Sequence, residues 1–297
     1  MKRMNNNVCG AVMKIFLFLF IIGLRTANLF AQKTDVAAFV PVSTDSIPAW
    51  QIAEHSFTFG VGKTHVLDTY LSPIVYSGPE VRLMFEKTRP LKRGNGRILS
   101  QTIVQGHFAY TKNPSKMADE YVGMLQLNFG WHYKFYNYRR LQLYAGLAGD
   151  LNAGCFYMKR NSNNPAQGKL YFNTELSGMA VYHFRIKRKW LKVRYQLSAP
   201  LMGVMFSPEY GQSYYEIFSL RQSKGNVKFT HPFNEPSLRH YLSVDIPFRT
   251  YAMRVGYIGD FHQSKVNNLK CHTYSHLFMF GVVKHLFLLK QKQRVIY

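Results

Sequence analysis

YVGMLQLNFGWHYKF, residues 121–135, keeps every charged, amide or imidazole side chain at an even position. The odd positions are aromatic, aliphatic or glycine throughout. Successive side chains of a β-strand point to opposite faces. The stretch therefore predicts a strand with one fully apolar face and one polar face.

The same alternation occurs along most of the chain after residue 54. Nine further strands are predicted at 55–63, 80–88, 101–110, 141–156, 170–185, 191–205, 238–248, 249–264 and 269–287. The last of these segments is apolar on both parities, so its faces stay unassigned.

Strand length and strand connections favour a membrane barrel over a soluble sandwich with the same alternation. Several strands reach about 15 residues, where the strands of globular sheets are usually about 5–6 long. Every second connection is tight, and the others lengthen up to the stretch 207–237. Bacterial outer-membrane barrels combine short periplasmic turns with longer outer loops. The predicted fold is all-β, an antiparallel transmembrane β-barrel of about ten strands, with eight or twelve as alternatives.

Aromatic residues gather where the apolar strand faces approach the short turns. They include Trp131, Tyr133, Phe135, Tyr182, Phe184 and Tyr251. Transmembrane barrels carry a girdle of aromatic side chains at each membrane interface. These positions predict one such girdle.

The two ends of the chain differ from the alternating part. Lys2, Arg3 and Lys14 precede a short apolar run at 15–24, which is typical of a secretory signal peptide. Cleavage is expected before Gln32, with Met13 as an alternative start and an uncleaved anchor as the rival interpretation. The predicted organisation is a signal peptide at 1–31, a linker at 32–54, the barrel at 55–287 and a basic tail at 288–297.

The chain is strongly basic, with 38 Lys and Arg against 15 Asp and Glu. Removing residues 1–31 deletes four basic residues, so the mature charge is 34 − 15 = +19. An exported chain rarely meets nucleic acid, so outer-membrane lipid and lipopolysaccharide are the expected partners. The two mature cysteines, Cys155 and Cys271, do not form a disulfide framework.

Two motifs resemble a family of exported Gram-negative proteins that is catalogued as a domain of unknown function. The first is DTYLSP at 68–73, followed by Tyr76 and Gly78, and it is expected to open the first long loop. The second is FSPEYGQSYYEIF at 206–218, which opens the longest loop. The resemblance covers roughly residues 55–287. It implies an outer-membrane location and supplies no activity or catalytic residue.

The tripeptide His262-Gln263-Ser264 is similar to the His-x-Ser motif of outer-membrane phospholipases. There the histidine acts as a base and the serine as a nucleophile, with an asparagine orienting the base. Asn267 and Asn268 follow nearby. However, His262 and Ser264 share the parity of the polar face, whereas a lipid hydrolase must meet its substrate on the lipid face.

Charged residues on the polar faces allow a second chemistry. They are Glu80, Arg82, Glu86, Asp150, Glu175, Arg194, Arg254 and Asp260. Paired carboxylates, or an Asp–His pair, are able to perform acid–base hydrolysis, as in ten-stranded outer-membrane proteases. The structural interpretation is an ion-paired lumen, because buried charges need partners. His272 and His276 lie about 13 Å apart on an extended strand, so no metal site is expected, and no cofactor.

The loop 207–237 is rich in tyrosine and phenylalanine. These rings are expected to fold over the barrel mouth, and contact with a protein or a glycan is the alternative. The leading function is therefore a non-enzymatic outer-membrane barrel with a structural, adhesion or narrow-channel role. The alternative is an outer-membrane hydrolase that uses either His262 and Ser264 or the carboxylates of the lumen.

Overall fold

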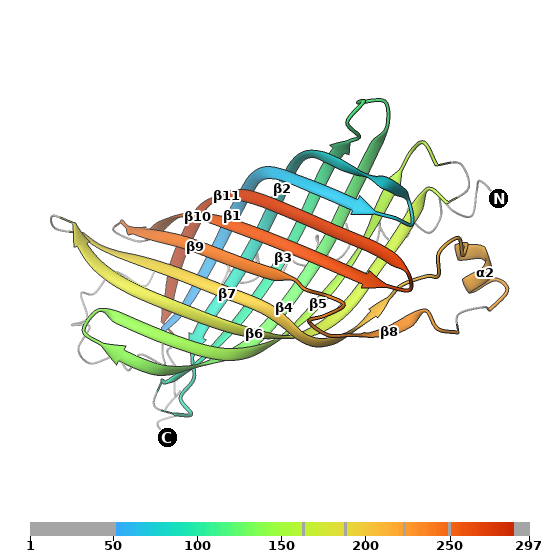
Figure 1. The fold of residues 1–297 in the computed structure, drawn as a ribbon. Helices are drawn as coiled ribbons and strands as arrows, with labels where there is room; N and C mark the ends of the chain where they lie inside the picture. The colour runs from blue at the N-terminus through green and yellow to red at the C-terminus, as the bar shows by residue number, and fades with distance from the viewer. Residues whose placement is uncertain are drawn as a thin grey trace, which may run out of the picture. The chain divides into compact units, whose positions relative to one another are not determined.

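A computed structural model describes residues 52–94, 96–161, 164–186, 189–221, 224–248 and 251–287. Figure 1 shows the long strands tilted around a common axis. The strands are β1 (Ile52–Asp68), β2 (Ser72–Pro90), β3 (Ile98–Lys112), β4 (Asp119–Tyr138), β5 (Leu141–Met158), β6 (Ala166–Ile186), β7 (Lys189–Phe206), β8 (Val227–Thr230), β9 (Leu238–Pro247), β10 (Ala252–Val266) and β11 (Leu269–Phe287). The predicted signal peptide, the linker up to residue 51 and the basic tail lie outside the described residues.

Ten of these strands close into one antiparallel barrel. Each strand of the barrel pairs with its neighbour in the chain, except that β7 pairs with β9. The short strand β8 pairs with the last four residues of β7, 203–206. The pairing of β1 with β11 closes the cylinder, with Ile52 opposite Phe287. The predicted closed barrel of ten antiparallel strands is therefore confirmed.

The outer surface of the barrel is apolar along a continuous path around the wall. Starting at Phe57, the register leads to exposed apolar partners on each successive strand: Phe85, Val104, Leu127, Leu151, Phe172 and Val204. The predicted girdle residues Trp131, Tyr133, Phe135, Tyr182 and Tyr251 are also exposed. Side chains on the exterior strand faces thus form the apolar band that a lipid bilayer requires.

The two ends of the barrel differ from the prediction in detail. The chain enters and leaves at one end, where residues 139–140 form a two-residue turn. At the other end the turns at 69–71 and 267–268 have three and two residues, because β1, β2 and β10 run past their predicted limits. The first motif, DTYLSP, therefore forms a turn and the start of β2 instead of a long loop. Residues 52–54, assigned to the linker, already belong to β1.

The faces of the last strand are resolved by burial. Leu277, Met279 and Val283 are buried in the lumen, whereas Phe278 and Phe280 are exposed. The lumen of this barrel accepts apolar side chains as well as polar ones, so alternation of polarity fails in β11.

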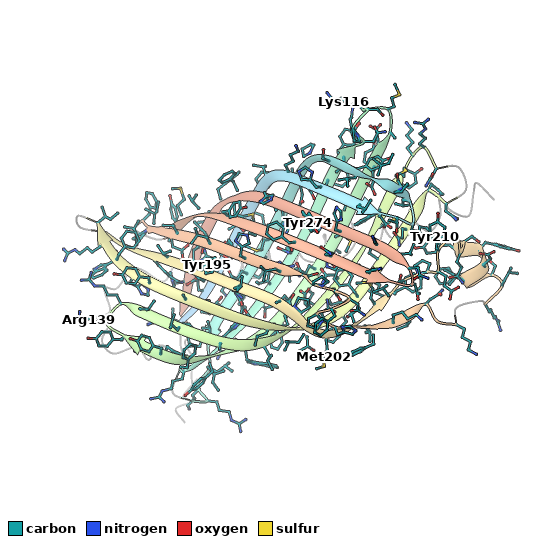
Figure 2. The ribbon with its side chains drawn as sticks, viewed as in Figure 1. Lys116, Arg139, Tyr195, Met202, Tyr210 and Tyr274 are labelled. Atoms are coloured by element: carbon teal, nitrogen blue, oxygen red, sulfur yellow. The ribbon has the colours of Figure 1, made fainter. Side chains whose placement is uncertain are left out.

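The long connection between β7 and β9 has its own structure. It contains α2 (Tyr214–Phe218), whose N-terminus is closed by a capping box between Ser213 and Glu216, and the short strand β8. Figure 2 places Tyr210 and Lys116 at this end and Arg139 at the opposite end. Among the described residues, no helix has the length and apolar character needed to cross a membrane.

Candidate functional site

An ion-paired layer, here called the ionic plug, fills the lumen near the end where the chain enters. It consists of three carboxylates and three cations: Glu54, Glu86, Asp245, Lys192, Arg194 and Arg254. Arg194 forks onto Glu86 through Nη1 and Nη2 at 2.5 and 2.6 Å. Arg254 reaches Glu54, Glu86 and Asp245 within 2.8 Å. Charges balance within this layer, which satisfies the requirement that buried charges be paired.

An apolar layer lies above the ionic plug. Met84, Tyr241, Ile258, Leu277 and Met279 form this buried cluster, with Ile103 packed against it. Together the two layers place buried side chains across the lumen between the chain-entry end and the middle of the barrel. Ten strands enclose a lumen only slightly wider than one that side chains fill completely.

A second polar region, here called the chamber, occupies the lumen beyond the apolar layer. Arg82 donates to Glu80 at 2.6 Å through Nη2 and to Asp260 at 2.6 Å through Nη1. Arg239 lies 3.4 Å from the same Asp260. Two carboxylates thus balance two guanidinium groups on one side of the chamber.

The other side of the chamber has carboxylates paired with amides. Asp150 accepts from Gln126 at 2.5 Å and from Asn128 at 3.2 Å. Asn128 also donates to Glu175 at 2.9 Å. Among the described residues no ion pair forms at Asp150 or Glu175, although both are buried. This side of the chamber therefore has more carboxyl groups than cationic side chains.

His262 lies at the rim of the chamber and faces the lumen, as its parity predicted. Its ring stacks on Tyr171 at 4.8 Å. Its Nδ1 lies 3.2 Å from Ser237 Oγ and 3.7 Å from Glu235 Oε1. Both neighbours meet the same ring nitrogen, whereas a catalytic triad uses the two nitrogens separately.

The proposed nucleophile Ser264 does not join this contact. It is buried on β10 opposite Cys271, and no hydrogen bond to His262 is found among the described side chains. Asn267 and Asn268 both have positive φ and form the β10–β11 turn. Asn267 donates to the carbonyl oxygen of Ser207 at 2.6 Å. No described hydrogen bond therefore joins His262 to Ser264, and both asparagines belong to the turn. The hydrolase interpretation stays a prediction.

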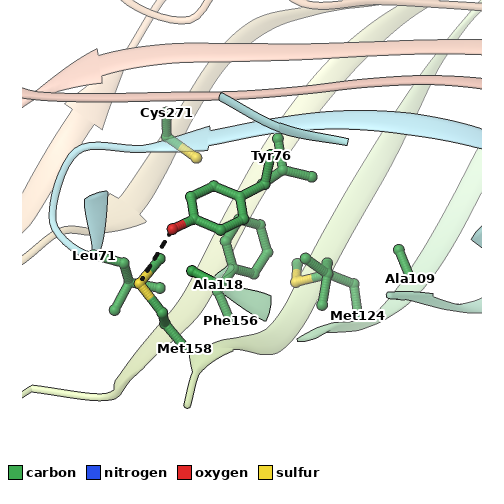
Figure 3. Close-up of a cluster of buried hydrophobic side chains, with 10 residues drawn as sticks. Leu71, Tyr76, Ala109, Ala118, Met124, Phe156, Met158 and Cys271 are labelled. Carbon is green, nitrogen blue, oxygen red and sulfur yellow. Dashed lines mark hydrogen bonds between the residues drawn. The ribbon is translucent and has the colours of Figure 1, made fainter. Parts of the chain in front are cut away.

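An apolar cluster caps the lumen at the far end. Figure 3 shows Tyr76, Phe156, Met158 and Met124 within it, and the Tyr76 hydroxyl lies 3.8 Å from the Met158 sulfur. Val66, Leu71, Ala109, Ala118, Val122 and Cys271 complete the cluster. The buried Cys271 forms no disulfide with a described residue.

The connection 207–237 covers this end only in part. Tyr214 accepts a hydrogen bond from the Gly168 backbone at 2.5 Å, and Tyr70 donates to the carbonyl oxygen of Gln212 at 2.7 Å. Burial raises the pKa of Tyr70 to about 12, so its hydroxyl stays a donor. Other rings of the connection face outward: Tyr210, Tyr215, Phe218, Phe229 and Phe233. The predicted folding of the aromatics over the mouth holds for Tyr214 and not for these five.

A cavity of about 60 Å³ runs through the chamber. Its lining includes Asp150, Glu175, Glu235, Arg239, Asp260 and His262. No group of three or more metal-ligating side chains is found among the described residues. The chamber can hold a small polar or charged group.

Sequence reasoning assigned Glu54 of the ionic plug to the linker, and it missed the three residues around His262: Tyr171, Glu235 and Ser237. Tyr171 precedes an outward phenylalanine on a strand whose other aromatics face lipid, and only parity marks it as inward. Glu235 and Ser237 belong to a connection without periodicity. Their positions depend on hydrogen bonds with β6 and β10, which no local sequence pattern encodes.

Solved structures with a similar shape are barrels of distant sequence. The outer membrane protease OmpT from Escherichia coli is 8% identical, with 79% of this chain and 96% of that chain covered and a TM-score of 0.46. The transport unit of the autotransporter AIDA-I from Escherichia coli is 7% identical, with 84% and 94% covered and a TM-score of 0.40. The translocator domain of NalP from Neisseria meningitidis is 10% identical, with 92% and 98% covered and a TM-score of 0.38.

No curated protein matches the sequence of this chain. A family model does match, over residues 13–293, and its description is a protein of unknown function, DUF3316. The match includes both motifs that predicted an uncharacterised family. The chain therefore belongs to the DUF3316 family.

Proposed function

We propose that this chain is a non-enzymatic outer-membrane barrel, exported by its N-terminal signal peptide, whose lumen is closed to solutes. The ionic plug carries this proposal. Glu86 is buried and bonded at once to Arg194, Arg254 and Gln101, so the side chains that would have to move to open a pore are fixed by several bonds each.

The exterior supports a location in the membrane. Exposing the apolar path from Phe57 to Val204 to water would cost free energy. Large exposed apolar patches of this kind mark surfaces that contact a membrane or another protein. Basic residues stand beside the aromatic girdle: the Arg140 guanidinium lies 4.9 Å from the Trp190 ring and the Arg139 guanidinium 5.1 Å from the Tyr138 ring. Such side chains suit the boundary between apolar tails and the anionic headgroups of the inner leaflet.

The non-enzymatic part rests on the arrangement around His262. Its Nδ1 is engaged by Ser237, and Ser237 also binds the backbone of Gln263 through 3.0 and 3.2 Å hydrogen bonds. This serine therefore holds the connection against β10. Asp260, the nearest carboxylate of the lumen in sequence, is neutralised by Arg82 and Arg239. Neither set is arranged as a base beside an accessible nucleophile.

Three measurements test the proposal. The mature protein should fractionate with outer membranes and migrate faster on gels unheated than boiled. In planar bilayers it should give no steady porin-like conductance, and deleting part of 207–237 should raise leakage only modestly, because the plug remains. Recovery as a soluble periplasmic protein, or large steady openings of the intact protein, would overturn the proposal.

A further inference from the structure

The barrel wall is interrupted on one side. The β7–β9 ladder ends at Ser198 opposite Arg239, and β7 resumes pairing only at Gly203, with β8. Pro200 lies in this interval and has no amide hydrogen for a ladder bond. A bulge against β6 also lies there and shifts the outward positions of β7 by one residue. Odd-numbered residues such as Tyr195 and Leu197 face outward before the bulge, and even-numbered residues such as Met202 and Val204 face outward after it. Figure 2 shows Met202 on the outer surface.

The segment 231–237 stands in this interval and is bonded to β10 and, through Glu235 and Asn173, to β6, but not to β7. Lys265 donates its backbone amide to the Asn234 carbonyl oxygen at 2.8 Å, and Ser237 binds the backbone of Gln263. No strand pairing joins residues 199–202 to this segment in the described part of the chain. The seam between β7 and the segment therefore has no backbone ladder in the described structure.

The cavity of the chamber reaches this seam. Its lining includes Leu238 and Phe261, which face outward on β9 and β10, together with Pro200 of β7. It also includes the inward carboxylates Asp150 and Glu175. The cavity is therefore lined by residues on both sides of the seam.

The exterior at this seam belongs to the apolar band. Val204 is in register with Phe172, and Phe172 with Leu151, all of them exposed. Phe233, next to the seam in the segment 231–237, is 93% exposed. A molecule that approaches the chamber by this route therefore comes from an apolar phase and needs an apolar tail.

The cavity of the chamber has one more carboxyl group than cationic side chains in its lining: Asp150, Glu175, Glu235 and Asp260 against Arg82, Lys169 and Arg239. Asp150 and Glu175 have amide partners but no ion pair in the described structure, and Glu235, 1% exposed, has an Oε2 atom without any hydrogen-bond partner there. Burying carboxyl groups without a cation is costly. An ammonium ion would offset that cost, and its compact shape suits a narrow cavity better than a planar guanidinium.

We propose that the seam between β7 and the segment 231–237 is a side entrance, through which the chamber takes up the head of a membrane amphiphile bearing a primary amine. The head lies against Asp150, Glu175 and Glu235, and the tail leaves between Leu238, Phe261 and Pro200 toward the lipid. This proposal rests on the membrane location proposed above.

The test uses the full mature protein in phosphatidylcholine vesicles and a radiolabelled dodecylamine with a diazirine beside the amine. Saturable binding above the uptake of protein-free vesicles is expected, and photolysis should label residues around Leu238 and Phe261. Dodecanol and dodecanoic acid carrying the same diazirine should label these positions far less. Equal labelling by all three, or no labelling at the seam, would overturn the proposal.

Two variants test the carboxylates separately. Glu175→Gln should weaken amine binding by about tenfold, because it removes a charge-assisted interaction. Glu235→Gln changes the connection outside the barrel strands and should weaken binding even if Glu175→Gln fails to fold. The matched control Glu209→Gln alters an exposed carboxylate of the same connection and should bind like the parent. Unchanged binding in both chamber variants would refute the assignment of the head.

Heat modifiability of the same vesicles separates the two proposals. A protein that shows the unheated shift but no amine binding refutes the side entrance and leaves the membrane location intact. A protein without the unheated gel shift refutes the membrane location, on which the side entrance rests.

Discussion

Removing the Arg254 guanidinium is the most direct challenge to the ionic plug. Arg254 is fully buried and binds Glu54, Glu86, Asp245 and the Ser56 hydroxyl. Arg254→Met keeps most of the side-chain volume and leaves three carboxylates against two cations. The barrel is expected to lose stability because the remaining carboxylates are buried with insufficient positive charge.

The magnitude follows from the burial of the partners. Removing one partner of a buried pair costs about 3–5 kcal/mol, since it leaves an uncompensated charge. At about 1.4 kcal/mol for each factor of ten, the unfolding equilibrium constant should rise roughly 100- to 4,000-fold. The matched control is Lys112→Met. Lys112 lies 4.0 Å from Asp119, with 43% of its side chain exposed, so the control should cost less than about 1 kcal/mol.

Urea unfolding in detergent micelles, followed by the loss of the unheated gel band, measures both variants. A second substitution supplies an internal check. Arg254→Met combined with Asp245→Asn restores a balance of two carboxylates and two cations, so the double variant should be more stable than Arg254→Met alone. The reasoning fails if Arg254→Met costs no more than Lys112→Met, or if adding Asp245→Asn destabilises the barrel further.

Three further predictions concern the exterior, the connection and the hydrolase alternative. Leu151 is exposed beside Leu127 and Phe172 on the apolar band, so Leu151→Arg should cost about 2–4 kcal/mol in vesicles, whereas Met117→Arg, in the 113–118 connection, should stay within about 0.5 kcal/mol. Burial and the Asp150 charge raise the pKa of Glu235 to about 7 from 4.5, so the folded state binds more protons and the closed connection loses stability as the pH rises from about 5 to 7. Hydrogen exchange at 231–237, corrected for intrinsic rates, should show more opening at pH 8 than at pH 5, and Glu235→Gln should abolish the difference. Purified protein in mixed micelles should hydrolyse no phospholipid, with or without calcium, and Ser264→Ala should behave like the parent; hydrolysis that disappears in Ser264→Ala and His262→Ala would establish the hydrolase.

The barrel could be predicted from the sequence because lipid imposes one rule on every strand. Each outward side chain of the apolar band must be apolar, so Leu127, Leu151 and Phe172 each belong to an alternating series of apolar residues on their own strand. The lumen imposes no such rule. It holds Arg254 and Leu277 on adjacent strands, each in a layer of its own kind, so β11 carries apolar residues on both faces and gives no alternation.

The site could be predicted only as a set of polar side chains. The sequence places Glu86, Arg194 and Arg254 on the polar face, but their pairing depends on strand register and barrel closure, which join residues 168 positions apart. His262 and Ser264 were paired because they are near in sequence. In the structure, the partners of His262 are Ser237, which reaches it from the end of the long connection, and Tyr171, which reaches it from β6 across the lumen.

Pro200 is a residue from which one feature of the wall, the interruption in β7, could be predicted. A proline inside a strand that otherwise alternates indicates a bulge or an unpaired edge, and at this position the outward parity changes from Leu197 to Met202. A closed barrel has no free edge, so an unpaired position in the wall must be covered by another segment or left open to lipid. Here the segment 231–237 covers it while bonded to β10 and β6 but not to β7. One residue, Pro200, was therefore enough to predict the interruption. The position of the chamber behind it could be found only from the three-dimensional structure.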